Sequence, residues 1–467
     1  MVVILLFTLS SVSLAQKITQ LVHPAPNGAI VEYLLTDGTV MVQGGSCSDF
    51  WKLTPDDTGS YVKGTWKQLA SLPSGYAPYA DAAAVLADGR LLISGGEYSN
   101  CGAQFTLTNQ SAIYDPAKDK WTMVAPPKGW YDIGDSPSLV LPNGTFLMGR
   151  KTNKNMAVLD PITLKWSALK STGKSDFNAE EGWTLMPNGT VLTYDVKNNP
   201  NSEIYDPSKQ TWTSAGSTVA NLQGPPEEGC LHYGNNHIYC PPGEVGPAIL
   251  RPNGTVFATG ALHLNATTGH TAIYSKGKWA AGPDFPNGDA AGDSFAALLT
   301  NGRVLVEGNS GTLYEFDGSK LTSTAVSFGS LIVMPTGEVL LGGTAAYTST
   351  GTYKSSWAPK ITAFPATVTR GSTYKISGKQ FNGLSQALAF GDEFESATNY
   401  PMVRITNQGS GHVFYAKTHD HSSMGVATGK ATVSTNFDVP AGMETGSSTL
   451  EVVANGIPSK PVSITVN

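Results

Sequence analysis

The dominant pattern along the chain is a pair of short apolar runs separated by a polar turn that ends in glycine. It occurs seven times, as YLLTDGTVMVQGG, AVLADGRLLISGG, LVLPNGTFLMGR, TLMPNGTVLTYD, AILRPNGTVFATG, ALLTNGRVLVEGN and IVMPTGEVLLGG. Each copy predicts a β-hairpin. Asp-Gly and Asn-Gly are strong signals for a two-residue type I′ turn, because both central residues of that turn need φ > 0.

A second motif follows most of these hairpins and supplies two further strands. Its copies are IYDPAKDKWT, VLDPITLKWS, IYDPSKQTWT and IYSKGKWA, in which the last strand carries Trp121, Trp166, Trp212 or Trp279. Four strands per repeat are typical of propeller blades. The sequence therefore predicts a seven-bladed propeller, with the N-terminal KITQLVHP completing the last blade and closing the ring.

The composition changes after the propeller. Pro359 and Pro365 mark a junction, and alternating strands then continue to the end of the chain. About a hundred residues of this kind predict an immunoglobulin-like sandwich. The expected organisation is all-β, with a signal peptide over 1–15, a seven-bladed propeller over 16–356 and an immunoglobulin-like domain over 357–467.

Charge and the N-terminal segment narrow the classes of function. The formal net charge is −6 and the pI is near 5.8, so the basic footprint of a nucleic-acid-binding protein is missing. MVVILLFTLSSVSLAQ is too short to span a bilayer and has small residues at Ser13 and Ala15, which favours a cleaved signal peptide. We expect a secreted monomer without a membrane span.

Four cysteines suit an extracellular protein. Three pairings are possible, and the sequence favours Cys47–Cys101, each just beyond a Gly-Gly strand end, and Cys230–Cys240, which closes one loop. A zinc site is disfavoured because neither pair has CxxC spacing. N-glycosylation is expected in a eukaryotic host at the sequons that begin at Asn109, Asn143, Asn188, Asn253 and Asn265.

The recurring Gly-Gly pair, aromatic residue and tryptophan resemble the kelch repeat. A kelch propeller followed by such a sandwich resembles the galactose oxidase and glyoxal oxidase group of copper-radical oxidases. The resemblance implies copper held by two tyrosines and two histidines, one tyrosine being cross-linked to cysteine. It also implies that the hairpin GHVFYAKTHDHSSMGVATG, which contains His419 and His421, enters the propeller channel.

The inner strands do not supply the residues that this resemblance implies. Eight to ten residues before the hairpin glycines, five blades carry carboxylates instead: Asp81, Asp135, Glu181 (with Glu180 beside it), Glu244 and Asp293. Tyr79 precedes Asp81 by two residues but has no cysteine partner in its layer. A copper-radical site is therefore disfavoured.

Gathered carboxylates repel one another, and three interpretations stay open. They could hold a hard cation such as Ca²⁺, or one could keep a proton and act as a general acid. They could instead accept hydrogen bonds from loop amides. No other cofactor is predicted, and copper is not expected.

The i, i+2 spacing of His419 and His421 places both on one face of a strand, with Asp420 on the other. They are candidate metal ligands, or the positive counterpart of the carboxylate ring, or an interdomain hairpin with local hydrogen bonds. We expect them to meet the carboxylates. Arg404 is a candidate partner for pocket carboxylates or an anionic substrate.

Aromatic and loop residues complete the candidate site. Tyr79 and Trp183 are candidate substrate-binding residues, although Trp183 also fits a blade core. His232 and His237 lie in the expected disulfide loop and are candidates for lining the entrance. GDEFESATNY is acidic and loop-like but has too few oxygens for an EF-hand.

Three functions remain open. The first is a non-redox enzyme, such as a hydrolase or lyase, acting on a carbohydrate or another small molecule. The second is a non-catalytic glycan- or cell-wall-binding protein. The third, disfavoured by the missing ligands, is a copper-radical oxidase.

Overall fold

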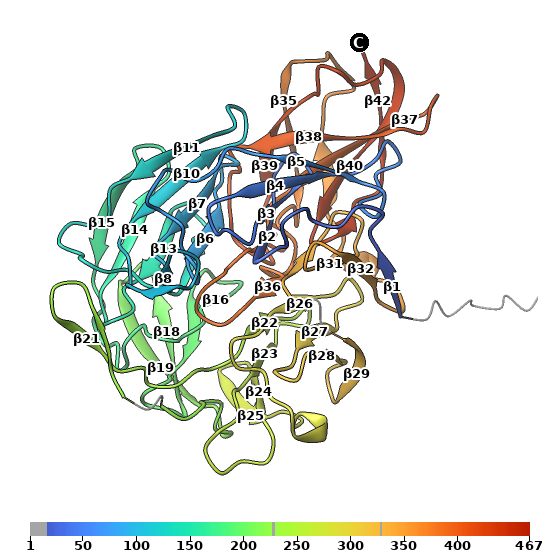
Figure 1. The fold of residues 1–467 in the computed structure, drawn as a ribbon. Coiled ribbons are helices and arrows are strands. Elements are labelled where there is room, and N and C mark those ends of the chain that lie inside the picture. The colour runs from blue at the N-terminus through green and yellow to red at the C-terminus, as the bar shows by residue number, and fades with distance from the viewer. Residues whose placement is uncertain (1–15, 227–228, 327–328) are drawn as a thin grey trace, which may run out of the picture.

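The computed structural model describes residues 16–226, 229–326 and 329–467, and the predicted signal peptide lies outside these ranges. Seven antiparallel sheets form a ring, which confirms the predicted seven-bladed propeller (Figure 1). No helix among the described residues is long and apolar enough to cross a membrane.

Each blade consists of four strands that run from the channel outward. Blades 1 to 3 contain β2 Val31–Leu34, β3 Val40–Gln43, β4 Phe50–Thr54 and β5 Thr65–Gln68; β6 Ala82–Val85, β7 Leu91–Ser94, β10 Ser111–Asp115 and β11 Lys120–Val124; β12 Ser138–Val140, β13 Phe146–Gly149, β14 Met156–Asp160 and β15 Lys165–Leu169. Blades 4 to 6 contain β16 Thr184–Leu185, β17 Val191–Tyr194, β18 Asn201–Asp206 and β19 Thr211–Ser217; β22 Ala248–Leu250, β23 Val256–Thr259, β24 Thr271–Ser275 and β25 Lys278–Ala281; β26 Ala296–Leu298, β27 Val304–Glu307, β28 Thr312–Phe316 and β29 Leu321–Val326.

The seventh blade joins the two ends of the propeller sequence. It contains β30 Leu331–Val333, β31 Val339–Leu341 and β32 Ala345–Thr348, and its outer strand is β1 Lys17–Gln20. Lys17 lies opposite Thr348 and Gln20 opposite Ala345. The N-terminal strand therefore closes the ring, as predicted.

The hairpin turns are held by the side chain that precedes the glycine. In blade 1, Asp37 Oδ1 accepts the backbone N–H of Thr39 at 3.0 Å, and Gly38 donates its N–H to the Leu35 carbonyl at 3.0 Å. Gly38 has φ 79°, whereas Asp37 does not have a positive φ. The predicted type I′ turn is therefore wrong. A single left-handed residue suffices here, because the Asp side chain satisfies the next free amide.

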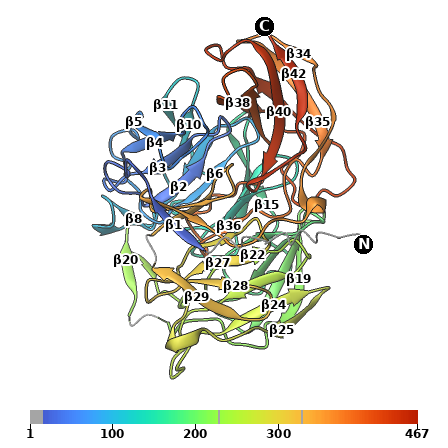
Figure 2. The ribbon, with the colours of Figure 1, turned by 90° about the vertical axis from the view of Figure 1, so that its right-hand side faces the viewer.

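The C-terminal domain is a β-sandwich that packs against the hairpin-turn end of the propeller (Figures 1 and 2). Its strands are β33 Lys360–Ala363, β34 Thr367–Val368, β35 Thr373–Lys379, β37 Met402–Asn407, β38 Val413–His419, β39 Val433–Asp438, β40 Gly446–Ala454, β41 Ile457–Pro458 and β42 Val462–Val466. Thr418 donates its N–H to the Thr36 carbonyl at 3.0 Å. A Cβ on Gly38 would lie 2.3 Å from the ring of Tyr415, so this contact requires glycine.

One loop of the C-terminal domain enters the centre of the propeller. We call residues 386–400 the channel segment. Its strand β36 (Leu388–Ala389) pairs with the innermost strand β26, and Figure 1 shows it inside the ring. Further along, Phe394 donates its N–H to the Asp81 carbonyl at 2.9 Å, while Gln386 Oε1 accepts the N–H of Leu185 at 2.7 Å. The segment is thereby fixed to blades 2, 4 and 6.

Short elements complete the described chain. Two hairpins lie outside the blades, β8 Tyr98–Ser99 with β9 Gln104–Phe105 and β20 Leu231–Tyr233 with β21 His237–Tyr239. Two 3-10 turns span Pro286–Gly288 and Ser355–Trp357. Both favoured disulfides, Cys47–Cys101 and Cys230–Cys240, are confirmed.

Candidate functional site at the channel mouth

Seven carboxyl side chains gather at the channel end that lies away from the hairpin turns. We call them the acidic centre: Glu97, Asp135, Glu180, Glu244, Asp293, Asp392 and Glu393. Four of them stand three or four residues before the innermost strand of their blade, which begins at Ser138, Thr184, Ala248 or Ala296. Asp392 and Glu393 come from the channel segment instead.

On one side of the acidic centre, Lys151 pairs with three carboxyl groups. Its side chain is fully buried, and its Nζ lies 2.7 Å from Glu180 Oε1 and 3.3 Å from Glu97 Oε1, and also contacts Asp135. Burial alone would lower the pKa of Lys151, but the carboxylates of Asp135 and Glu180 raise it well above its usual value. The hydroxyl of Tyr239 donates to Glu180. Lys151 therefore stays charged and pairs with these carboxyl groups.

On the other side of the acidic centre, Asp392 forms no ion pair with a lysine or arginine among the described residues. Asp392 is fully buried, and its oxygens accept no hydrogen bond from an N–H or hydroxyl group of the described residues; its side-chain partner is the carboxyl of Glu393. An oxygen of Asp392 lies within 4.8 Å of oxygens of Asp293 and Glu393, and also within 4.8 Å of oxygens of Asp135 and Glu180. Asp392 thus connects the two sides, and other carboxyl groups surround its own.

Burial and like charge disfavour ionisation on this side. Desolvation, followed by neighbouring carboxylates, raises the pKa values of Glu244 and Glu393 well above their usual range. Asp293 reaches solvent at the mouth, yet desolvation of its carboxyl and the charge of Glu180 raise its pKa to about 7. Each shift expresses the free-energy cost of ionising a carboxyl group that is buried beside other carboxyl groups.

The geometry of the Asp293, Asp392 and Glu393 oxygens suits a hard cation. Ca²⁺ takes six to eight oxygen ligands, with carboxylates preferred among side chains. Three carboxyl groups within 4.8 Å of one another provide part of such a shell, and the exposure of Asp293 leaves room for water or ligand oxygens.

Two predicted residues of blade 2 occupy different places. Tyr79 lies at the rim, with its ring 5.5 Å from that of Phe394, and its pKa is raised by burial and by Glu393. Asp81 is fully buried beside Tyr33 and Tyr76, and neither of its oxygens has a partner among the described residues. Burial raises the pKa of Asp81 well above its usual value. Asp81 is thus a neutral core acid outside the acidic centre.

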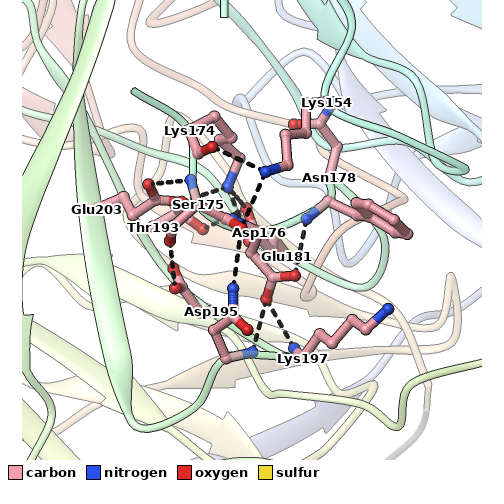
Figure 3. Close-up of polar contacts among 12 residues, drawn as sticks. Lys154, Lys174, Ser175, Asp176, Asn178, Glu181, Thr193, Asp195, Lys197 and Glu203 are labelled. Atoms are coloured by element: carbon pink, nitrogen blue, oxygen red, sulfur yellow. Dashed lines mark hydrogen bonds and ion pairs between the residues drawn. The ribbon is translucent and has the colours of Figure 1, made fainter. Parts of the chain in front are cut away.

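Glu181 does not belong to the acidic centre, contrary to the prediction. Its Oε2 lies 2.7 Å from Nζ of Lys174, which also lies 2.8 Å from Glu203, and Figure 3 shows this buried network in blade 4. Lys174 stands 4.6 Å from the ring centre of Trp212. Glu180, the residue before it, reaches the channel instead, because the backbone of Glu180 is left-handed (φ 58°) and turns the two side chains apart.

The structure places two further predicted substrate-binding residues away from the acidic centre. Trp183 is 3% exposed and packs against Trp212, with ring centres 6.0 Å apart, so it is part of the blade core. Arg404 pairs with Glu451 on the adjacent strand β40, with Nη2 2.8 Å from Oε2. Cross-strand neighbours satisfy its charge within the sandwich, and it does not reach the channel carboxylates.

The histidine hairpin is also placed differently from the prediction. His421 donates its backbone N–H to the carbonyl of Ala87 in a hairpin turn of blade 2, at the opposite end of the channel from the acidic centre. Its Nδ1 lies 2.9 Å from Thr435 Oγ1. The Nδ1 of His419 lies 2.7 Å from Oδ2 of Asp420. The structure does not bring either histidine to the carboxylates.

The backbone around His419 and His421 explains why they do not reach the acidic centre. Strand β38 ends at His419, and Asp420 has a left-handed backbone (φ 52°), so the alternation that would put both histidines on one face is broken. The channel is entered by the channel segment instead. The sequence analysis therefore missed Asp392 and Glu393, which lie on this segment. It also missed Lys151 and Glu97. The signal for the first two was the acidic run GDEFES, which the sequence analysis described only as acidic and loop-like.

A groove of about 670 Å³ lies between the β8–β9 and β20–β21 hairpins. Its lining includes Ser99, Gln104, Gln110, His232 and Asn236, and no Asp, Glu, Lys or Arg. The hairpins that form its walls lead to the acidic centre, because Tyr98 follows Glu97 and Tyr239 donates to Glu180. The structure thus places His232 at this groove, beside the channel mouth.

Comparisons with known proteins support the fold. No protein-family model matches the chain. A kelch-like protein, terF of Aspergillus terreus, is 28% identical over 126 residues, which are 27% of this chain and only about a quarter (26%) of terF. The chain resembles the solved structure of a fungal alcohol oxidase of the AA5 family in complex with copper (TM-score 0.52, 13% identity, 98% of this chain and 100% of that one). A catalytically inactive virginiamycin B lyase from Staphylococcus aureus matches 71% of this chain and 98% of its own, with TM-score 0.48 and 9% identity, which is too distant to inform function.

The residues at the channel mouth do not fit a radical-copper centre. All four cysteines of the chain form disulfides, so none is available for a cross-link to tyrosine. The donors at the mouth are carboxylate oxygens, which suit Ca²⁺ or Mg²⁺ better than copper.

Proposed function

We propose that this protein is a secreted non-redox enzyme that binds a hard divalent cation such as Ca²⁺ at the acidic centre and acts there on a carbohydrate or another small hydroxylated molecule. The ligands from the chain are Asp293, Asp392 and Glu393. Two disulfides support the extracellular location.

Asp392 is the observation that carries this proposal. A buried carboxylate normally has hydrogen-bond donors or a cation beside it, because an unsatisfied buried charge is costly. Asp392 has no ion pair among the described residues, its side-chain hydrogen-bond partner is another carboxyl group, Glu393, and four other carboxyl groups have oxygens within 4.8 Å of its own. Lys151 pairs with Asp135 and Glu180, whereas Asp293 and Glu393 form no ion pair among the described residues, so a second positive charge fits beside them.

The cation gives the mouth a chemistry that suits hydroxylated ligands. The chain supplies fewer oxygens than Ca²⁺ prefers, so hydroxyl groups of a ligand complete the shell and become more acidic. Glu244 lies next to Asp293, and its raised pKa suits it to keep a proton and donate it as a general acid. The adjoining neutral groove accommodates further sugar units without a charged contact.

Calcium titration of the full-length protein tests the cation. We expect a single saturable Ca²⁺ site by calorimetry after treatment with EDTA. Asp392→Asn should weaken binding by about tenfold or more, since one charged ligand is lost. Glu395→Gln is the matched control. Glu395 is also buried in the channel segment, but its carboxyl is not part of either carboxyl cluster that contains Asp392. Equal affinity in both variants, or no saturable binding, would refute the cation site.

Activity is tested on a panel of neutral and acidic oligosaccharides by mass spectrometry of the products. We expect product formation that needs Ca²⁺ and is abolished by Asp293→Asn.

A non-catalytic glycan-binding protein is the second candidate, and the neutral groove favours it. In that case an oligosaccharide binds saturably, no product forms, and Gln104→Ala weakens binding whereas Asp293→Asn does not.

A further inference from the structure

A second cavity, of about 720 Å³, lies on the C-terminal domain where the interdomain linker meets the sandwich. Four lysines line it: Lys360, Lys379, Lys430 and Lys460. They come from the first strand β33, the end of β35, and the two loops before β39 and β42. The cavity is thus distinct from both the acidic centre and the neutral groove.

These four charges have no counterpart in the protein. The lining contains no Asp or Glu, and none of the four lysines forms an ion pair among the described residues. Such an excess of positive charge stands out in a chain whose formal net charge is −6.

Two of the lysines are fixed directly opposite each other. Lys360 on β33 and Lys379 on β35 are register partners in an antiparallel pair. Like charges in this position destabilise a sheet, because the side chains lie side by side on the same face. The linker is held at this place, since Gln380 Nε2 donates to the Ser356 carbonyl at 3.0 Å. An anion between the lysines would remove the repulsion.

We propose that this cavity binds an acidic oligosaccharide, that is, a sugar chain carrying at least two carboxylate or sulfate groups. Several anionic groups are needed to engage four lysines that enclose a cavity of this volume. Ile361, Val462 and two prolines also line the cavity and provide apolar contacts for the C–H faces of sugar rings.

Other anions fit less well. The lining has no aromatic side chain on which a nucleic-acid base could stack. Membrane surfaces are bound by protruding apolar or basic groups, whereas these lysines surround a cavity. A free phosphate ion is too small to contact four lysines around such a volume.

Binding of defined ligands to the full-length protein tests this site. The probes are an oligogalacturonate, a heparin-derived oligosaccharide, a neutral dextran oligosaccharide, phosphatidylserine vesicles and a single-stranded oligonucleotide. We expect one or both acidic oligosaccharides to bind saturably, and the two separate the carboxylate from the sulfate source. Raising the NaCl concentration about tenfold should weaken binding strongly, because the contacts are ionic and solvent-exposed.

Matched variants locate the binding. The double variant Lys360→Gln/Lys379→Gln should lose about tenfold or more in affinity, whereas Lys278→Gln/Lys320→Gln, which removes two exposed propeller lysines, should bind like the wild type. A melting temperature no lower than that of the wild type shows that the first variant is folded, since it removes a like-charge pair. Equal losses in the two variants, tighter binding to vesicles or the oligonucleotide, or no binding of either acidic oligosaccharide would overturn the proposal.

Discussion

Glu180 and Glu181 are consecutive residues whose carboxylates pair with two different buried lysines. Glu180 lies 2.7 Å from Lys151 in the channel, and Glu181 lies 2.7 Å from Lys174 in blade 4. One short stretch before β16 therefore anchors two charge networks, and each network fixes the backbone from which the other projects.

Removal of the blade 4 lysine should destabilise the protein strongly. Lys174→Met leaves Glu181 and Glu203 buried without their cation, and breaking a buried pair in this way costs about 3–5 kcal/mol. The measurement is the free energy of unfolding in urea. Lys209→Met is the control, because Lys209 is 73% exposed in its pair with Asp206 and should contribute less than about 1 kcal/mol. Similar losses in the two variants would contradict the assignment.

A methyl group at Gly182 should displace the channel segment. Its Cβ would lie 2.2 Å from the carbonyl oxygen of Gly391, a distance that forces backbone to move. Gly182→Ala should therefore lower the melting temperature and weaken Ca²⁺ binding at Asp392. Gly391→Ala is the matched control on the other side of the same contact, because its Cβ would meet its nearest atoms only at 3.6 Å. Wild-type behaviour of Gly182→Ala would show that the segment does not fill the channel as described.

His421 should make stability depend on pH below neutrality. Desolvation, with a smaller contribution from His419, lowers the pKa of His421 to about 3, and Asp420 opposes this shift. The unfolded imidazole takes up a proton near pH 6.5 whereas the folded one stays neutral, so stability falls as the pH drops from about 6.5 toward 3. The loss from this residue between pH 7.5 and 5 is about 2 kcal/mol. His421→Gln should flatten the profile of unfolding free energy against pH, and an unchanged slope would count against it.

The two disulfides should differ in their contribution to stability. Cys47 and Cys101 are separated by 54 residues, and Cys230 and Cys240 by 10. Chain-entropy estimates are about 4 kcal/mol for the longer loop and about 3 kcal/mol for the shorter one. Replacing each pair by serine and measuring unfolding in guanidinium chloride checks the order. A larger loss for the Cys230–Cys240 pair would indicate that its hairpin contributes through contacts such as Tyr239 with Glu180.

The fold could be predicted because its signals are local and repeated. Each hairpin needs only its apolar runs and a polar turn that ends in glycine, and closure by the N-terminal strand follows from a blade that lacks its fourth strand. The same kind of local signal located Asp135, Glu244 and Asp293. The number of residues between each of them and its hairpin glycine determines at which end of the channel it lies.

The rest of the site depends on information that is not local. Nothing in GDEFES shows that these residues enter a channel, because β36 pairs with a strand about 90 residues away in sequence. Glu181 and His421 were misplaced because single left-handed residues, Glu180 and Asp420, reverse the direction that strand periodicity predicts. Arg404 has its partner on a strand that the sequence analysis did not pair with its own.

The pairing of β1 with β32 also limits when the propeller can form during synthesis. Lys17 meets Thr348 across more than three hundred residues, so the last blade stays incomplete until most of the chain has left the ribosome. Bringing such distant segments together is slow, because the entropy of closing the intervening loop is lost before the contact forms. Until then, the exposed edge of β32 is available to strands of other chains, and the N-terminal strand acts as its intramolecular protector.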